Sequence, residues 1–374
     1  MKRYSLIILS VSCIFIYLIF NSSEGNLAIE KIDVCSGLSF DLITSKPLTE
    51  YDVAASAYTF TKKNEISTVI LEGISKNIAE SRSARQTTSS KEFLLGLQKV
   101  FIFSEAVASY GINPIIDIMF SNQQMNDATW IVVCKDKALD MLKFKVEDAV
   151  SSADHIDGMI ESSMEQNFMS DDYKVVDTYV RVDSEGRNLV LPYLEILNNK
   201  ITLNGMAVFK KDKMVATIPI KDARYMNILR EDKVKGILTL QKDSLKLISN
   251  YGESKRKVHC KQINGKYKFI IDLEFKGQVI NNTMYSDFMI NPKTVEKYTH
   301  ELEKETEKRC NEFINKMQNQ YKVDCLELGR DAAATFGRSP ETDWDNIVCN
   351  ADIIVNVKVK VNNLGRGQFL FKSK

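Results

Sequence analysis

A single apolar run at the start of the chain constrains the protein most. Residues 5–20, SLIILSVSCIFIYLIF, follow the basic pair Lys2 and Arg3. A secretory signal combines a basic start with about 7–15 apolar residues and a small-residue cleavage site, which here would lie after Gly25. A spanning helix needs roughly 17–25 residues, and residues 4–20 meet the lower bound. The basic pair is expected to stay in the cytoplasm, so the bulk of the chain is expected outside.

Cys13, inside this run, raises a third outcome, which is attachment of a lipid to its thiol. A lipobox has a Leu-like residue three places before the modified Cys, and here that residue is Ser10, with Leu9 one place too early. Seven apolar residues follow Cys13, where a lipoprotein turns polar. We therefore expect an uncleaved anchor first, a signal cleaved after Gly25 second and a lipoprotein third. A cytosolic chain with an N-terminal core helix comes last.

The rest of the chain, about 350 residues, is long enough for two or three domains. No second apolar run of this length occurs, so this part is predicted to be soluble. Its 50 basic and 49 acidic residues nearly cancel, which argues against a nucleic-acid partner because non-specific binding needs a basic field. The short basic cluster at 255–257 is interpreted as a solvated hairpin end.

The cysteines favour buried thiols over a disulfide framework. Seven occur, an odd number, and none forms a Cys-x-x-Cys pair. Several lie within apolar stretches, and free cysteine behaves as a small buried hydrophobe. Most are therefore predicted to fill the core, with one disulfide bridge left open.

The first half of the chain alternates between strand and helix patterns. Strands are predicted at 29–42, 51–61, 94–103 and 128–136 because these stretches are rich in β-branched and aromatic residues. Helices are predicted at 65–85, after Ser104 up to Gly111, from Asn113-Pro114, and at 146–167 with a break at Gly158. This alternation is typical of a mixed α/β fold.

The second half is predicted to be mainly antiparallel strands with one long helix. Strand patterns cover 189–197, 200–220, 235–243, 257–265, 266–279 and 352–365, and helices are predicted at 220–230 and 291–321. Asn264-Gly265 is the strongest hairpin turn signal. The fold class is thus predicted as α+β or mixed α/β, multidomain, with mixed sheets flanked by helices. The predicted units are an anchor or signal at 1–25, a domain at 26–198 that is itself divisible in two, and a domain at 199–374.

Motifs for catalysis, cofactors or metals do not emerge from the sequence. Nucleophile-elbow, phosphate-loop, dinucleotide-binding and zinc-protease motifs are absent. His155 and His300 lie on polar helix faces, and His259 next to Cys260 is a weak metal signal because catalytic zinc uses three protein ligands. Asp343, Trp344 and Asp345 could suggest a sugar site, but one aromatic residue between two acids on a loop is more often a docking residue for the adjoining strand. We predict no catalytic, cofactor or metal site and no enzyme.

Five stretches stand out in order along the chain: IEKIDVCSGLSFDL with Gly37 and Asp41; QKVFIFSEAVASYGINPIIDIMF with Glu105, Ala108, Gly111, Ile112 and Pro114; NGMAVFKKDKMVA; QNQYKVDCLELG with Gln318, Asp324 and Gly329; and the closing valine strand with Gly365. Together they resemble the germinant-receptor C-subunit family, Ger(x)C, of spore-forming bacteria. The resemblance covers nearly the whole chain after residue 25.

The resemblance implies a non-enzymatic subunit on the outer face of the spore inner membrane. It would act beside a multi-span A subunit and a transporter-like B subunit, and would meet a small-molecule germinant only indirectly. The family fold is mixed α/β in three small domains. The chain departs from the family at Cys13, which is misplaced for a lipobox, and at 121–130, which lacks an expected basic–acidic pair.

Two other functions stay open. An extracellular solute-binding protein would need a deep cleft lined by convergent polar groups. An enzyme that uses a pair of carboxylates is third, because Asp and Glu are plentiful.

Overall fold

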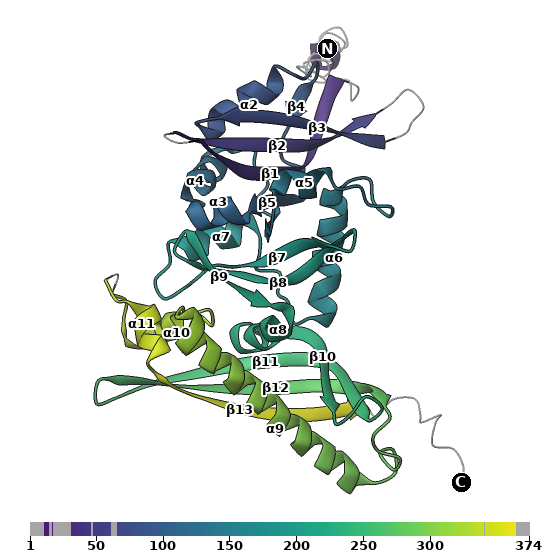
Figure 1. The fold of residues 1–374 in the computed structure, drawn as a ribbon, viewed down its shortest axis with the longest axis vertical. Coiled ribbons are helices and arrows are strands. Elements are labelled where there is room, and N and C mark those ends of the chain that lie inside the picture. The colour runs from purple at the N-terminus through teal and green to yellow at the C-terminus, as the bar shows by residue number, and fades with distance from the viewer. Residues whose placement is uncertain are drawn as a thin grey trace, which may run out of the picture.

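The computed structural model describes residues 11–14, 17, 31–45, 48–60, 66–339 and 341–363. Among these residues, nine strands form one sheet (the large sheet) and four form another (the small sheet). The large sheet occupies one end and the middle of the long axis, the small sheet occupies the other end, and helix α8 (Ile220–Arg230) lies between them (Figure 1). Both sheets mix parallel and antiparallel pairs and are flanked by helices, so the predicted fold class is confirmed.

The large sheet has a parallel centre with antiparallel flanks. Its strand order is β3-β2-β1-β5-β6-β7-β8-β9, and β4 pairs with β1. The strands are β1 (Ile32–Ser45), β2 (Leu48–Phe60), β3 (Ile66–Ser75), β4 (Glu92–Leu94), β5 (Val100–Ser104), β6 (Trp130–Cys134), β7 (Val190–Leu197), β8 (Lys200–Lys210) and β9 (Lys213–Pro219). Strands β1, β5, β6 and β7 are parallel neighbours. Parallel neighbours need crossover connections, and helices supply them here.

These helices are α2 (Ile78–Gln86), α3 (Glu105–Tyr110), α4 (Asn113–Ser121), α5 (Ala138–Lys143), α6 (Ser152–Gln166) and α7 (Val175–Val182). Two of these helices, α3 and α4, begin where the sequence signals lie. The Ser104 hydroxyl accepts a hydrogen bond from the Val107 amide, and Gly111 ends α3 with a φ of 134°. Pro114 lies in the first turn of α4. Because helices and neighbouring strands enclose them, every residue of β5 and β6 is buried.

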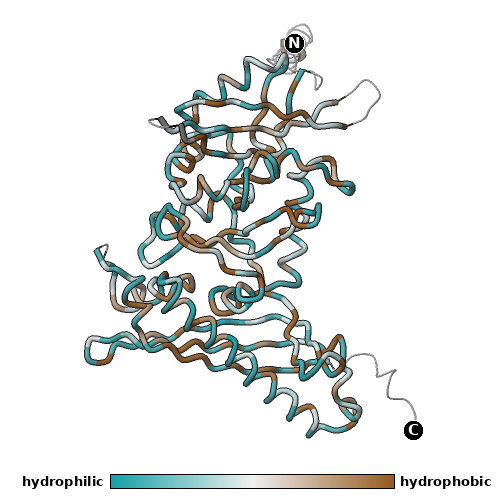
Figure 2. Tube along the Cα trace, viewed as in Figure 1, coloured by the Kyte–Doolittle hydropathy of each residue, from teal (hydrophilic) through white to brown (hydrophobic). Residues whose placement is uncertain are grey.

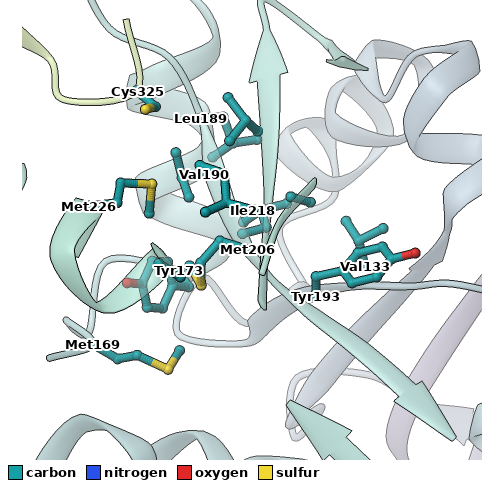
Figure 3. Close-up of a cluster of buried hydrophobic side chains, with 14 of the residues drawn as sticks. Val133, Met169, Tyr173, Leu189, Val190, Tyr193, Met206, Ile218, Met226 and Cys325 are labelled. Atoms are coloured by element: carbon teal, nitrogen blue, oxygen red, sulfur yellow. The ribbon is translucent and has the colours of Figure 1, made fainter. Parts of the chain in front are cut away.

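One part of the core joins the large sheet to α8. Figure 3 shows Met206 and Ile218 of strands β8 and β9 near Met226 of α8, with Tyr173 and Cys325 in the same cluster. All five side chains are almost fully buried. The hydrophobic core is therefore continuous across the middle of the molecule.

The small sheet consists of a long hairpin with one strand on each side. Its strands are β10 (Val234–Gln241), β11 (Leu247–Ile263), β12 (Lys266–Asn282) and β13 (Asp352–Asn363). Asn264 and Gly265 form the predicted turn with φ of 50° and 77°, the left-handed pair that a two-residue hairpin requires. The hairpin tip is hydrophilic (Figure 2). β13 pairs with β12 in parallel because the chain returns through a long helical crossover.

That crossover comprises α9 (Pro292–Lys316), the short π-helix η2 (Met317–Tyr321), α10 (Leu328–Phe336) and α11 (Trp344–Cys349). Together, α9 and η2 form the long helix predicted at 291–321. α9 crosses the small sheet (Figure 1) and buries Tyr298, Leu302 and Phe313. Val355, Val357 and Val359 of β13 are buried, as their alternation with polar residues predicted.

The helix predicted at 65–85 is wrong in its first half. Residues 66–75 form β3, which pairs with β2 from Ile66 to Ser75, and the helix begins only after Asn77. Thr68, Val69 and Ile70 are β-branched, and their pairing with β2 outweighs the helical spacing of the apolar residues.

Three smaller interpretations also need correction. The strand predicted at 94–103 is two strands, interrupted near Gly96, whose φ is 99°. Helix α6 continues through Gly158 without a break, since glycine in a helix costs only about 1 kcal/mol. The basic cluster at 255–257 lies within β11, away from the hairpin end, and Arg256 is largely buried beside Asp331.

Candidate functional site

A cavity of about 820 Å³ opens at the carboxyl ends of the central parallel strands. We call it the strand-end cavity. It is lined by Asp41 of β1, Ser104 at the end of β5, Cys134 and the residues after it at the end of β6, and Glu195 of β7. In open α/β sheets, this edge is where ligands bind, because loops and helix starts gather there.

Two carboxyl groups lie opposite each other in this cavity. Asp41 and Asp52 are cross-strand partners on β1 and β2. Asp41 accepts hydrogen bonds from the backbone amides of Ala138 (2.9 Å) and Leu139 (2.8 Å) at the start of α5. Burial raises the pKa of the Asp41 carboxyl, and burial and nearby Glu72 raise that of Asp52. The Oδ1 atom of Asp52 is buried and has no hydrogen-bond partner in the described chain.

The other polar groups of the cavity suit binding more than catalysis. Lys135 pairs with Glu195, which also accepts a hydrogen bond from Asn204 (2.7 Å). Burial raises the pKa of the Cys134 thiol, so it stays protonated and is a poor nucleophile. None of the three histidines lines the cavity. Asp52 lines the cavity, but its unpartnered Oδ1 atom is itself shielded from solvent.

The histidines, and the motif singled out near residue 344, have local roles. His155 lies 3.1 Å from Asp148, and His300 is well exposed on α9. Asp343 caps α11, and the indole of Trp344 donates to Glu185 (2.8 Å). Trp344 is buried and has a docking role, but it begins helix α11 and does not lie on a loop, and its indole docks onto the segment around residue 185.

The structure leaves the predicted lipidation residue untested. Cys13 is an exposed free thiol, while most of the apolar run, Gly25 and Gly365 lie outside the described residues. In the part of the chain that the structure describes, no helix has both the length and the apolar character needed to cross a bilayer.

The described residues contain no group of three or more acidic, His or Cys side chains that would hold a metal ion. All seven cysteines are described and free, and four are buried (Cys35, Cys134, Cys310 and Cys325), as core filling predicted.

A buried charged cluster joins segments that lie far apart in the sequence. We call it the junction cluster; it consists of Arg181, Arg187, Arg230, Glu327 and Arg330. The Glu327 carboxylate accepts from Arg230 (2.6 Å), Arg181 (2.9 Å), Arg187 (3.0 Å) and Arg330 (3.2 Å). Burial alone would raise the pKa of Glu327, but the arginines, Arg230 foremost, outweigh it and hold that pKa at about 2. Four cations therefore meet one carboxylate that remains ionised.

The cluster ties the first half of the chain to the second. Arg181 belongs to α7 and Arg230 to α8, and Glu327 is the residue that directly precedes α10. Beside it, Asp324 accepts from the amides of Leu326 (3.0 Å) and Gly329 (2.7 Å) and is fully buried, which raises its pKa to about 7. Sequence reasoning noticed Asp324 and Gly329 only as family positions. It missed Glu327 and its arginines, because up to 146 residues separate the partners.

Comparison with known proteins finds relatives over most of the chain. Residues 26–196 match the family model described as the spore germination protein N-terminal domain, and residues 204–365 match the one described as spore germination B3/GerAC-like, C-terminal. The chain is 22% identical over 284 residues to the spore germination protein GerQC of Bacillus cereus, a match that covers 74% of this chain and 77% of the relative. It is 21% identical over 304 residues to the spore germination protein YndF of Bacillus subtilis, covering 77% and 74%.

A solved structure shares the fold. The crystal structure of the GerBC protein superimposes with a TM-score of 0.57 at 14% sequence identity, covering 87% of this chain and 97% of that chain. At this identity, the likeness concerns the fold alone.

Proposed function

The chain belongs to the family of GerAC-like spore germination proteins, and on that premise we propose that it is the C subunit of a germinant receptor. The observation that carries the proposal is the succession of two family matches over 26–196 and 204–365. We further propose 26–198 and 199–374 as its two working units, since the matched ranges meet near residue 200.

In this proposal the subunit is attached to the spore inner membrane and faces outward. The apolar run at 4–20 and the basic residues before it support this placement. The partners are a multi-span A subunit and a transporter-like B subunit, as the family resemblance implies. A small-molecule germinant acts on the subunit only through them.

The subunit is proposed to be non-enzymatic and to need no cofactor. The chemistry of the strand-end cavity supports this, because the Cys134 thiol is protonated and Asp41 is engaged by backbone amides. The junction cluster supports a role as a rigid scaffold, since it ties α7, α8 and the start of α10 to one buried carboxylate.

Deletion of the gene in its spore-forming host tests the proposal. Spores without the chain are expected to lose the response to at least one nutrient in a panel, measured as the fall in optical density on germination. The full-length gene restores the response, and a copy without residues 1–25 does not. Unchanged germination with every nutrient, or turnover of a substrate by the purified protein, would contradict the proposal.

The strand-end cavity, with the carboxyl groups of Asp41, Asp52 and Glu195 in its wall, favours a second candidate, an extracellular solute-binding protein. A tight cationic solute would raise the melting temperature of the purified protein by mass action. An Asp52→Asn variant would abolish that shift. Thermal-shift screening with simple amines and metal ions separates this candidate from the first.

A further inference from the structure

A second cavity, larger than the strand-end cavity, lies away from it along one edge of the molecule. It has a volume of about 1020 Å³, and we call it the side groove. Its walls come from α4, from α7 with the segment 183–188 after it, and from the β8–β9 turn at 210–212, Asp324 and residues 341–345 at the start of α11. These elements follow one another along the same edge in Figure 1. The first two belong to the N-terminal matched range and the others to the C-terminal one, so an occupant would touch both.

An exposed aromatic pair lines the groove. Phe120 is 74% exposed although it is a large apolar side chain. Its ring packs edge-to-face against Tyr179, with 5.1 Å between the ring centroids. The Tyr179 hydroxyl is buried and has no hydrogen-bond partner in the described chain. The pair therefore offers the exposed ring of Phe120 as an apolar contact, while the Tyr179 hydroxyl lies below the surface.

The charges of the groove are strongly unbalanced. Asp117, Asp183, Asp212 and Glu341 line it, and their carboxylates make no ion pair or hydrogen bond within the described residues. Among its basic residues, Arg187 is held by Glu327 (3.0 Å) and Lys210 by Asp345 (3.3 Å). That leaves Lys211 as the unpaired cation in the described part of the lining. Four free carboxylates therefore face one free ammonium group.

We propose that the side groove binds a basic segment of a partner protein, in which lysine or arginine residues flank an aromatic or large aliphatic residue. The apolar residue would cover Phe120, and the basic residues would meet the four carboxylates. These carboxylates come from four different elements along a long groove, which fits an extended segment better than a solute with a single ammonium group. The proposal rests on the proposed role as an interaction subunit and adds the place and the chemistry of one contact.

The test uses the full-length chain in detergent micelles and fluorescence anisotropy. The probe is a short fluorescein-labelled peptide of Lys and Arg around one Phe. Matched peptides carry Glu in place of the basic residues, or Gly in place of the Phe. We expect the basic aromatic peptide to bind, the other two to bind at least about tenfold more weakly, and the affinity to fall with added salt.

Variants then assign the binding to the groove. The double variant Asp117→Lys with Asp183→Lys, and the variant Phe120→Ala, are each expected to weaken peptide binding by about tenfold or more. The control Glu80→Lys with Glu161→Lys makes the same charge change on α2 and α6 and leaves binding unchanged. Tyr179→Phe is a second control, because it removes the buried, unpartnered hydroxyl but keeps the ring under Phe120: it should keep or raise the melting temperature and leave peptide binding in place.

The outcomes that overturn the proposal are specific. They are no binding of the basic aromatic peptide, an equal loss in the control pair, or competition by free lysine as strong as by the peptide, which would assign the groove to a small solute. Failure of the proposed function looks different. If deletion leaves germination unchanged while the peptide still binds through the groove, the receptor role fails and the groove assignment stands.

Discussion

The Oε1 atom of Glu327 lies 2.6 Å from Nη2 of Arg230, across 97 residues of sequence. Both side chains are almost fully buried, and Glu327 also accepts from three further arginines. The pair therefore holds α8 to the segment before α10. The stability of the middle of the molecule is therefore expected to depend on the single negative charge of Glu327.

Glu327→Gln is expected to lower the free energy of unfolding by roughly 3–5 kcal/mol, because the buried guanidinium groups of Arg181 and Arg230 lose the carboxylate that they share. Chemical denaturation of the purified protein measures this. Glu305→Gln is the matched control. Glu305 pairs with Arg309 on the exposed face of α9 (2.8 Å), and its loss is expected to cost about 0.5 kcal/mol or less. Equal costs for the two variants would contradict the role given to the junction cluster.

Asp324 is expected to make stability fall as pH rises from about 4 to about 7. Burial raises its pKa from 3.8 to about 7 in the folded protein. The folded state thus binds a proton that the unfolded state has already released, and its stabilising effect is complete below the unfolded pKa and lost as pH rises through the folded one. Asp324→Asn should flatten this part of the stability profile. Melting temperatures measured across the pH range decide the matter, and a profile with the same slope in the variant would refute it.

The junction cluster, next to Asp324, is expected to change stability in the opposite direction at lower pH. Its carboxylate, Glu327, has its pKa depressed to about 2, so its contribution is present above the unfolded value of 4.5 and is lost as pH falls towards 2. Acid unfolding of Glu327→Gln should therefore show a weaker pH dependence below pH 4.5 than that of the unmodified chain.

Gly186 is expected to tolerate no side chain. Its φ is 69°, and an added Cβ would lie 2.4 Å from the carbonyl carbon of Gly329. Gly186→Ala should cost on the order of 2 kcal/mol, because it combines backbone strain with a clash between two backbones. Gly158→Ala in α6 is the control. Nothing lies near its added Cβ, so it should stabilise the helix by about 0.5–1 kcal/mol. Thermal unfolding should therefore move in opposite directions for the two substitutions.

Strand β13 forms an edge of the small sheet, and two side chains of α9 cover it. The amides of Val357 and Val359 donate to Glu307 (3.1 Å) and Glu303 (2.9 Å). Removing both acceptors with Glu303→Ala and Glu307→Ala should expose an unpaired edge and promote self-association. Light scattering after size-exclusion chromatography measures it, with Glu312→Ala as the control on the same helix. A double variant as monomeric as the control would show that the glutamates do not guard the edge.

The intact mass of the membrane-extracted protein tests the three fates of the N-terminal run. We expect the full chain from Met1. A mass lacking residues 1–25 would indicate a cleaved signal, and a diacylglyceryl mass that disappears in Cys13→Ser would indicate a lipoprotein.

Several elements were predictable because their signals lie between neighbouring residues. The Asn264-Gly265 turn, the capping of α3 by Ser104 and the buried valines of β13 each follow from a short pattern. The long helix followed from apolar residues three and four positions apart. The predicted helix at 65–85 failed because its first half has a strand partner, β2, that no local pattern reveals.

The sequence by itself determined the mixed fold class, most helix and strand positions, the apolar N-terminal run and the family resemblance. Only the tertiary structure decided that β13 pairs in parallel with β12, that four arginines converge on Glu327, and that α4 and α7 meet the β8–β9 turn in one acidic groove. The physical reason is range. Turns, caps and periodic faces depend on residues within a few positions, whereas pairing partners and buried charges depend on which distant segments the collapsed chain brings together.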